Sequence, residues 1–146
     1  MAVAASYFSE EQQMLLKNAI ARNEKHTTGE IRVYIDSTIK GDVLDRAAEI
    51  FETLKMHETL LHNGVLIYVA IEMRQFAIIG DSGIHQHVSQ NFWEKVKSEM
   101  IPFFKRQDYT GGLLHAIDET GKKLKIHFPV TKDDVNELPN DVIFGE

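Results

Sequence analysis

The first part of the chain changes from a helical pattern of apolar residues to a strict alternation of polar and apolar ones. Ser9 stands three positions before Gln12, which is the arrangement of a capping box, and apolar residues then recur at helical spacing. This pattern predicts a helix over about 10–25. Residues 30–36 alternate with a period of two and predict a half-buried strand.

The next pattern predicts a second helix and two further strands. Asp42 suits the N-cap of an amphipathic helix that carries Leu44 on its apolar side and ends near His57. Residues 65–71 form a continuous apolar run, typical of a strand buried on both faces. After a tight turn, residues 75–80 predict an antiparallel third strand. The strand-helix-strand order predicts that the first two strands are parallel, so the sheet is mixed.

Two long helices complete the predicted domain. Ser89 suits the N-cap of a helix that is bent or stopped at 101–102 by a proline, and a last helix runs from near Thr110 to just before Pro129. With helices on both faces, residues 1–128 predict one α/β domain. Its fold class is a three-layer α/β/α sandwich with a small mixed β-sheet, Rossmann-like, in which a βαβ unit is followed by an antiparallel hairpin strand.

The remaining residues, 129–146, are rich in acidic side chains and contain two prolines. They predict an extended tail whose apolar end, Val142-Ile143-Phe144, docks on the domain.

Composition and charge narrow the function classes. Of the 146 residues 43% are hydrophobic, enough for a single core, and the net charge is −6 with no basic stripe. Nucleic acid is therefore not expected as a partner, whereas cations or basic proteins are. The absence of cysteine excludes disulfides and thiolate chemistry. Without a basic leader or a long apolar run, no membrane insertion is expected, and the chain as it stands is predicted to be cytoplasmic.

Four short strings, in this order and at these separations, resemble the TPM domain family, which occurs in thylakoid-lumen and bacterial envelope proteins. The resemblance covers roughly 9–128. The strings are Thr28-Gly29-Glu30-Ile31, His62-Asn63-Gly64-Val65-Leu66, Ile79-Gly80-Asp81-Ser82-Gly83 and Ile101-Pro102-Phe103-Phe104-Lys105-Arg106-Gln107-Asp108-Tyr109.

The resemblance implies a Rossmann-like fold, binding of divalent cations in some members, and a disputed acid phosphatase activity in plant members. The chain departs from the family pattern at two places. His62 stands where the family usually has Asp, and the segment 80–83 stands where the family has a Gly-Tyr-Gly turn. If the chain loses an acidic ligand at His62 and gains one at Asp81, it keeps a metal site with altered geometry. Alternatively, the two departures indicate a different ligand preference in this branch of the family.

The predicted topology brings one group of polar residues to the edge where the strands begin. Glu30, His62 and Asn63 open the two parallel strands, and the third strand runs back to deliver Asp81 there. Oxygen ligands of this kind, with loop carbonyls, favour Ca²⁺, with Mg²⁺ and Zn²⁺ as alternatives. The alternative reading is structural, because Asn-Gly is a common turn and an Asp before a helix is a common cap.

A second group follows the strands at the opposite edge, where open α/β sheets bind ligands. It consists of Asp36, Asp42, Asp45 and Asp108. Asp42 and Asp108 are further candidate metal ligands, but Asp42 and Asp45 also fit a helix cap and first-turn acids.

The sequence leaves three functions open. The leading hypothesis is a divalent-cation-binding module, and the alternatives are a metal-dependent acid phosphatase on phosphomonoesters and a non-catalytic module for an unknown protein partner. His85 and His87, together with His62 and Asp81, suggest Zn²⁺, although the spacing of these histidines is better explained by exposure to solvent. Ser82 follows Asp81, but no base can be assigned to it from the sequence, and no known nucleophile motif occurs.

Overall fold

A computed structural model describes residues 3–130 and 142–145 of the chain. The helices are α1 (Glu10–Glu24), α2 (Val43–Thr53), α3 (Ser82–His85), α4 (Gln90–Lys105) and α5 (Tyr109–His127). The strands are β1 (Glu30–Asp36), β2 (Gly64–Ala70), β3 (Gln75–Gly80) and β4 (Val142–Phe144). Three 3₁₀ turns connect them, at Ala4–Tyr7, Met56–Glu58 and Ile71–Met73.

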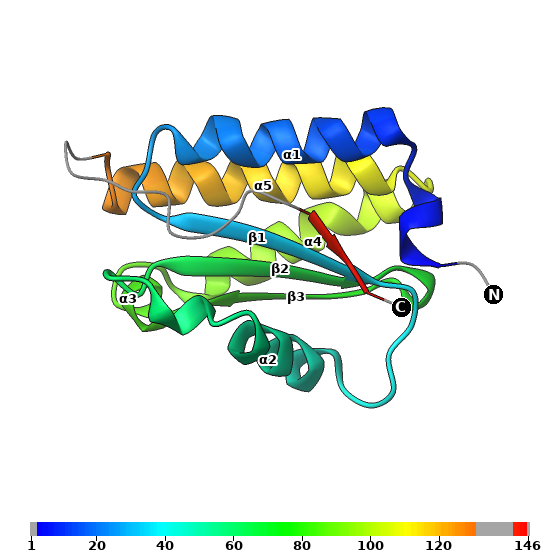
Figure 1. Cartoon of the computed structure of the whole chain (residues 1–146), viewed down its shortest axis with the longest axis horizontal. Helices are drawn as coiled ribbons and strands as arrows, with labels where there is room; N and C mark the ends of the chain where they lie inside the picture. Colours follow the sequence, from blue (N-terminus) through cyan, green and yellow to red (C-terminus); the bar gives the residue numbers. More distant parts are fainter. Residues whose placement is uncertain (1–2, 131–141, 146) are drawn as a thin grey trace.

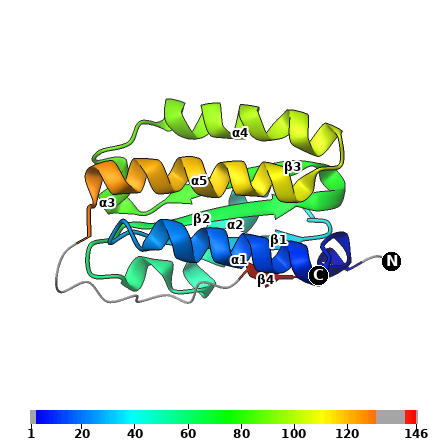
Figure 2. The same ribbon diagram turned by 90° about the horizontal axis from the view of Figure 1, so that it is seen from above.

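The strands form one mixed sheet in the order β3-β2-β1-β4. β1 is parallel to both β2 and β4, whereas β3 is antiparallel to β2. Helices α1, α4 and α5 cover one face of the sheet and α2 lies on the other (Figures 1 and 2). The predicted α/β/α sandwich with a mixed sheet is confirmed.

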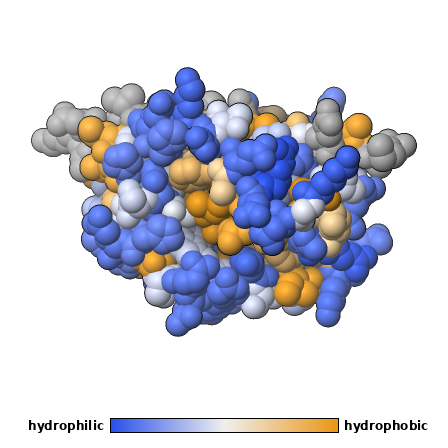
Figure 3. Space-filling view, turned by 90° about the horizontal axis from the view of Figure 1, so that it is seen from below, coloured by the Kyte–Doolittle hydropathy of each residue, from blue (hydrophilic) through white to orange (hydrophobic). Residues whose placement is uncertain are grey.

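The central strand β2 separates two apolar cores, as its continuous apolar run predicts. All seven of its residues are buried. Val65, Ile67 and Val69 pack into the large core beneath α1, α4 and α5. Leu66, Tyr68 and Ala70 pack into a smaller core on the side of α2. Among the described α-helices only α2 covers this second face, where apolar side chains show among hydrophilic ones (Figure 3).

The helix starts are fixed by the side chains that the sequence pattern indicates. At α1, Ser9 Oγ accepts from the backbone N–H of Gln12 at 3.1 Å and Gln12 Oε1 accepts from the N–H of Ser9 at 2.9 Å, which completes the capping box. At α2, Asp42 Oδ2 accepts from the N–H groups of Leu44 and Asp45. These bonds satisfy donors that a helix start otherwise leaves unpaired.

The end predicted for α2 was wrong, and of the two alternatives predicted at 101–102, a bend or a stop, the stop was wrong. Helix α4 continues through Pro102 to Lys105, because the proline lies on the exposed side in the last turn while Met100 and Phe104 anchor the helix in the core. Helix α2 ends at Thr53 rather than near His57, because Lys55 adopts a left-handed conformation (φ 56°) that no α-helix continues through.

The predicted orientation of Leu44 was also wrong. Its exposed fraction is 56%, and the apolar side of α2 is instead formed around Ala47 and Ile50. Leu44 lies in the first turn of the helix, directly after the loop that leads from β1.

The far end of the chain returns to the sheet. Val142–Phe144 lies beside β1, with Val33 opposite Val142 and Ile35 opposite Phe144, and the Phe144 ring is 5.8 Å from that of Phe8. The rest of the predicted acidic tail, residues 131–141 and 146, lies outside the described residues. Within the described parts of the chain, no helix has the length and apolar character needed to cross a membrane.

Candidate functional site

The edge at which β1 and β2 begin brings together the first predicted group of residues, Glu30, His62, Asn63 and Asp81, which we call the strand-start edge. In the register of the sheet, Glu30 lies opposite Gly64, and its backbone N–H donates to the carbonyl of Asn63 at 3.3 Å. The N–H of Asp81 donates to the carbonyl of Gly64 at 2.9 Å. The predicted proximity of these four residues therefore agrees with the structure, whereas their role as metal ligands stays a prediction.

Asp81 presents the most informative carboxylate of this edge. Its Oδ1 accepts from the backbone N–H of Ser82 at 2.7 Å and so caps the short helix α3. Its Oδ2 is buried and has no hydrogen-bond donor among the described residues. The nearest charged partner is His62, whose Nδ1 lies 3.4 Å from this oxygen.

The backbone around His62 is held in an unusual conformation. His62 has a φ of 50°, in the left-handed region that non-glycine residues seldom adopt. The N–H of Gly83 donates to its carbonyl at 2.8 Å. A Cβ on Gly83 would lie 2.6 Å from that carbonyl oxygen and 2.4 Å from the one of Leu61, so only glycine allows this approach. Backbone strain held by close packing is frequent at binding sites.

Glu30 and Asn63 lie deeper in the molecule than the other two residues. Their exposed fractions are 3% and 1%. The Asn63 amide donates to Thr28 Oγ1 at 3.2 Å and thereby ties the loop before β1 to the loop before β2. This contact supports the shape of the strand-start edge.

At the opposite edge, where β1 and β2 end, Asp36 is the residue with the tightest contacts. This carboxylate is 3% exposed, and its Oδ2 accepts from the hydroxyl of Tyr68 at 2.6 Å and from Nε of Arg46 at 3.2 Å. Burial and the hydrogen bond to Asp36 raise the pKa of Tyr68. Burial alone would lower the pKa of Arg46, but its hydrogen bond to Asp36 and the charge of that carboxylate raise it overall.

A hollow of about 990 Å³ opens beside this carboxylate. Its polar lining includes Tyr34, Asp36, Ser37, Lys40, Arg46 and Glu72. Its lining contains both cationic and anionic side chains, so the hollow has no single charge that would select one class of ligand.

The remaining predicted metal ligands act as helix caps. Asp42 caps α2, as described above, and Asp108 Oδ1 accepts from the N–H of Gly111 at 2.9 Å to cap α5. The turn between α4 and α5 lies at the same end of the sheet as the end of β1, but in the helix layer on the other side from α2 (Figures 1 and 2). Any role of Asp42 and Asp108 in metal binding stays a prediction.

The histidines after β3 lie beside the end of α5. The ring of His87 stacks on that of His127, with centroids 5.3 Å apart, and meets the ring of Phe128 edge-on. His85 ends helix α3. These contacts place His87 beside two aromatic rings, and both His85 and His87 are exposed, as the alternative reading of these histidines expects.

Sequence reasoning missed a further group of potential metal ligands, Glu99, His115 and Glu119, on neighbouring helices. The spacing of His115 and Glu119 by four residues on a predicted helix was a usable signal. The sequence holds no comparable signal for Glu99, because its position beside the other two residues depends on how α4 packs against α5.

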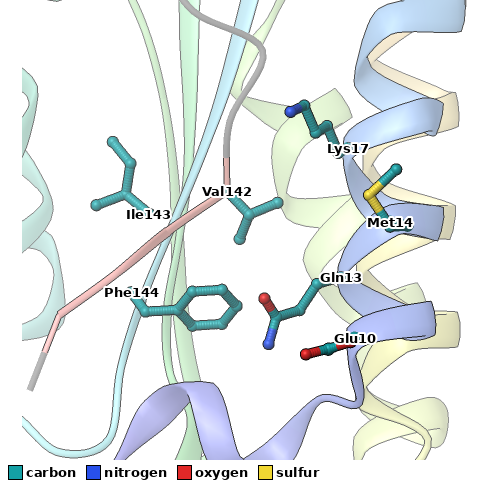
Figure 4. A pocket seen from close by; sticks show the side chains of 7 residues that line it. All are labelled: Glu10, Gln13, Met14, Lys17, Val142, Ile143 and Phe144. Atoms are coloured by element: carbon teal, nitrogen blue, oxygen red, sulfur yellow. The ribbon is translucent and has the colours of Figure 1, made fainter.

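A second hollow, of about 740 Å³, separates α1 from β4 (Figure 4). Its lining consists of Glu10, Gln13, Met14, Lys17, Val142, Ile143 and Phe144. This lining is mainly apolar, with a few polar groups supplied by the α1 wall.

The comparisons with known proteins agree with the fold. A family model described as TPM domain matches residues 2–123. The BA42 protein from the psychrophilic bacterium Bizionia argentinensis sp. nov., solved by NMR, is 43% identical, with a TM-score of 0.88 over 94% of this chain and 95% of that one. A search of the curated proteins found no match.

Two more distant structures share the fold alone. The N-terminal domain of the cg2496 protein from Corynebacterium glutamicum is 16% identical, with a TM-score of 0.64 over 80% of this chain and 74% of that one. The N-terminal domain of a protein from P. gingivalis is also 16% identical, with a TM-score of 0.73 over 87% and 84%.

Proposed function

We propose that this chain, which belongs to the TPM domain family, binds a divalent cation at the strand-start edge with the Asp81 carboxylate as its anchoring ligand. The observation that carries the proposal is the buried Asp81 Oδ2, which has no hydrogen-bond donor among the described residues. A buried carboxylate oxygen without a donor is costly, and a cation removes that cost.

The position of His62 also supports a cation. Two atoms that bind one ion with bonds of about 2.1 Å lie roughly 3–3.5 Å apart. The separation of 3.4 Å between Asp81 Oδ2 and His62 Nδ1 falls in this range. An ion that replaces the direct contact between these atoms therefore needs little rearrangement of either side chain.

Calcium is the ion that we favour. The loops at this edge offer backbone carbonyls beside the carboxylate, and Ca²⁺ takes six to eight oxygen ligands of this mixed kind. Recruitment of the His62 nitrogen would favour Zn²⁺ instead. Mg²⁺ is the third ion to compare.

The test is a titration of the metal-free chain with Ca²⁺, Mg²⁺ and Zn²⁺, followed residue by residue with amide NMR signals. We expect saturable shifts in residues 26–30, 60–64 and 80–86. Asp81→Asn keeps an acceptor for the Ser82 N–H but removes the charge, and should weaken binding at least tenfold. Asp42→Asn makes the same change at another helix cap and serves as the matched control.

Two results would contradict the proposed site, and a third would contradict the choice of Ca²⁺. Spectra that stay unchanged at millimolar concentrations of all three ions would exclude the site. Loss of binding in Asp42→Asn but not in Asp81→Asn would move the site to the opposite edge of the sheet. A Zn²⁺ response that His62→Asn abolishes, with no Ca²⁺ response, would reassign the ion.

The two alternative functions can be tested on the same samples. Turnover of an aryl phosphate that disappears with a chelator and with Asp81→Asn would favour the metal-dependent phosphatase. A binding partner recovered with the full chain, but not after removal of residues 129–146, would favour the interaction module.

A further inference from the structure

A second group of metal-binding side chains lies on the helical layer, away from both edges of the sheet. We call it the α4–α5 cluster, and it consists of Glu99, His115 and Glu119. From this group we infer a second metal site, which binds Zn²⁺ or an ion of similar preference through one imidazole nitrogen and two carboxylate oxygens.

The packing of two helices creates the cluster. A loop of three residues joins α4 to α5, so the helices run side by side in opposite directions (Figure 2). His115 and Glu119 are four residues apart on α5 and therefore project from the same side of that helix, one turn from each other. Glu99 reaches them from the facing side of α4, and its Oε1 lies 3.0 Å from His115 Nε2.

The distances suit one small ion. One ligand atom from each of the three residues can be chosen so that all lie within 4.8 Å of one another. A tetrahedral ion with bonds of about 2.0–2.1 Å holds its ligand atoms roughly 3.3 Å apart. The His115–Glu99 pair already has nearly this separation, so a rotamer adjustment of Glu119 is the main movement required.

Neighbouring side chains orient two of the three ligands. The Phe103 ring stacks on the His115 imidazole, with planes 25° apart and centroids separated by 6.0 Å. Lys122 Nζ lies 3.1 Å from Glu119 Oε2 and holds that carboxylate. The ammonium also competes with a cation for Glu119, but its side chain is 76% exposed and is free to move away into solvent.

The donor set selects the kind of ion. Zn²⁺ accepts both imidazole nitrogen and carboxylate oxygen as ligands, and three protein ligands leave a fourth position for water. Hard ions such as Ca²⁺ and Mg²⁺ prefer shells of oxygen alone. The side chains are between one quarter and about one third exposed, so an ion can enter from solvent while screening of the two carboxylates is reduced.

The test uses the full chain carrying Asp81→Asn, so that the site at the strand-start edge does not contribute. Addition of Zn²⁺ alone at pH 7.5 is expected to shift the amide signals around residues 99, 115 and 119 and the ring signals of His115. Both His115→Gln and Glu119→Gln should weaken Zn²⁺ binding at least tenfold by calorimetry, whereas Lys122→Ala should strengthen it.

Glu94→Gln is the matched control, because it removes a carboxylate from α4 outside the cluster and should leave the affinity unchanged. If Zn²⁺ shifts no signals around the cluster, the inference is wrong. It is also wrong if Glu94→Gln weakens binding as much as Glu119→Gln, since that result indicates adventitious binding to surface carboxylates. Because Glu119 is a partly exposed side chain on a helix surface, that variant remains informative if His115→Gln fails to fold.

Discussion

At the scale of single residues, Tyr68 and Asp36 form a polar contact that is almost fully buried within the sheet. Tyr68 lies in β2 with no exposed surface, and its hydroxyl is 2.6 Å from Asp36 Oδ2. A short bond from a hydroxyl to a carboxylate is among the stronger hydrogen bonds in proteins. The pair therefore contributes stability that depends on the protonation of the tyrosine.

Substitution of Tyr68 by Phe should lower the free energy of unfolding by about 1–3 kcal/mol at pH 7, because the buried Asp36 loses a donor. Burial and the bond to Asp36 raise the pKa of Tyr68, so the folded chain keeps this proton at pH values where the unfolded chain, with an ordinary pKa of about 10, loses it. The stabilisation that this bond contributes is thus fully present below pH 10 and falls as the pH rises further. Urea denaturation at pH 7, 9, 10 and 11 should show that the difference in free energy of unfolding between the unmodified chain and Tyr68→Phe narrows above pH 10. A difference that stays constant would contradict this prediction.

The sequence predicted which residues gather at the strand-start edge but not the contacts among them. Glu30 and His62 lie where β1 and β2 begin, and Asp81 follows the last residue of β3, so their proximity follows from topology alone. The tight approach of Gly83 to the carbonyl of His62 does not, because it depends on how a four-residue helix packs on a loop. Likewise Glu99 and His115 are sixteen positions apart, and only the packing of α4 on α5 joins them.

Helix α2 shows at the element scale how a local signal fixes a boundary. Asp42 accepts from two backbone N–H groups, at 3.0 and 3.1 Å, and adds a negative charge at the positive end of the helix dipole. Both contributions are independent of any metal.

Asp42→Ala should therefore lower the free energy of unfolding by about 1 kcal/mol, because the helix start loses its acceptor. Asp42→Asn should cost less, since an amide oxygen still accepts from the same N–H groups. Urea denaturation of the two variants beside the unmodified chain measures both values. Equal losses for Ala and Asn would mean that charge, rather than the hydrogen bonds, dominates at this cap.

Patterns that repeat along a whole element predicted the strands, and the capping residues Ser9 and Asp42 predicted two helix starts, whereas single residues misled at two helix ends. The apolar run of β2 and the alternation of β1 repeat over seven residues each, so one exception does not hide them. The prediction that β1 is only half-buried was wrong, because its polar residues Glu30, Arg32 and Asp36 are also buried. Pro102 is a single helix-breaking residue, and the buried anchors on either side of it decide that α4 continues. The early end of α2 depends on one residue in the left-handed conformation, Lys55. Because this residue is neither glycine nor asparagine, the sequence does not indicate that conformation.

At the scale of the whole molecule, the last described residues add the outer strand of the sheet beside β1. β4 covers the outer edge of β1 and forms one wall of the hollow that it shares with α1 (Figure 4). Three apolar residues are the only signal for this strand in the sequence, and its place beside β1 could not be derived from them.

Removal of residues 142–146 should lower the free energy of unfolding by about 1–3 kcal/mol, the order expected for loss of one partly buried aromatic side chain and its neighbours. The uncovered edge of β1 should also make the chain prone to association. Thermal unfolding and size-exclusion chromatography measure the two effects. Phe144→Ala keeps the strand and is the control that separates loss of the contact with Phe8 from loss of the pairing between β4 and β1. An unchanged melting temperature in the truncated chain would show that β4 does not contribute to stability.

The pairing of β1 with β4 also has a consequence for the order of events during folding. Val33 and Val142 are more than a hundred residues apart, so their contact closes a long loop and is expected to form late. At synthesis rates of 5–20 residues per second, β1 waits roughly 5–20 s before its outer partner exists. Pulse-labelling hydrogen exchange during refolding would show this order as late protection of the amides that join the two strands. During synthesis, β1 therefore remains an edge without its outer partner until residues 142–144 have been made.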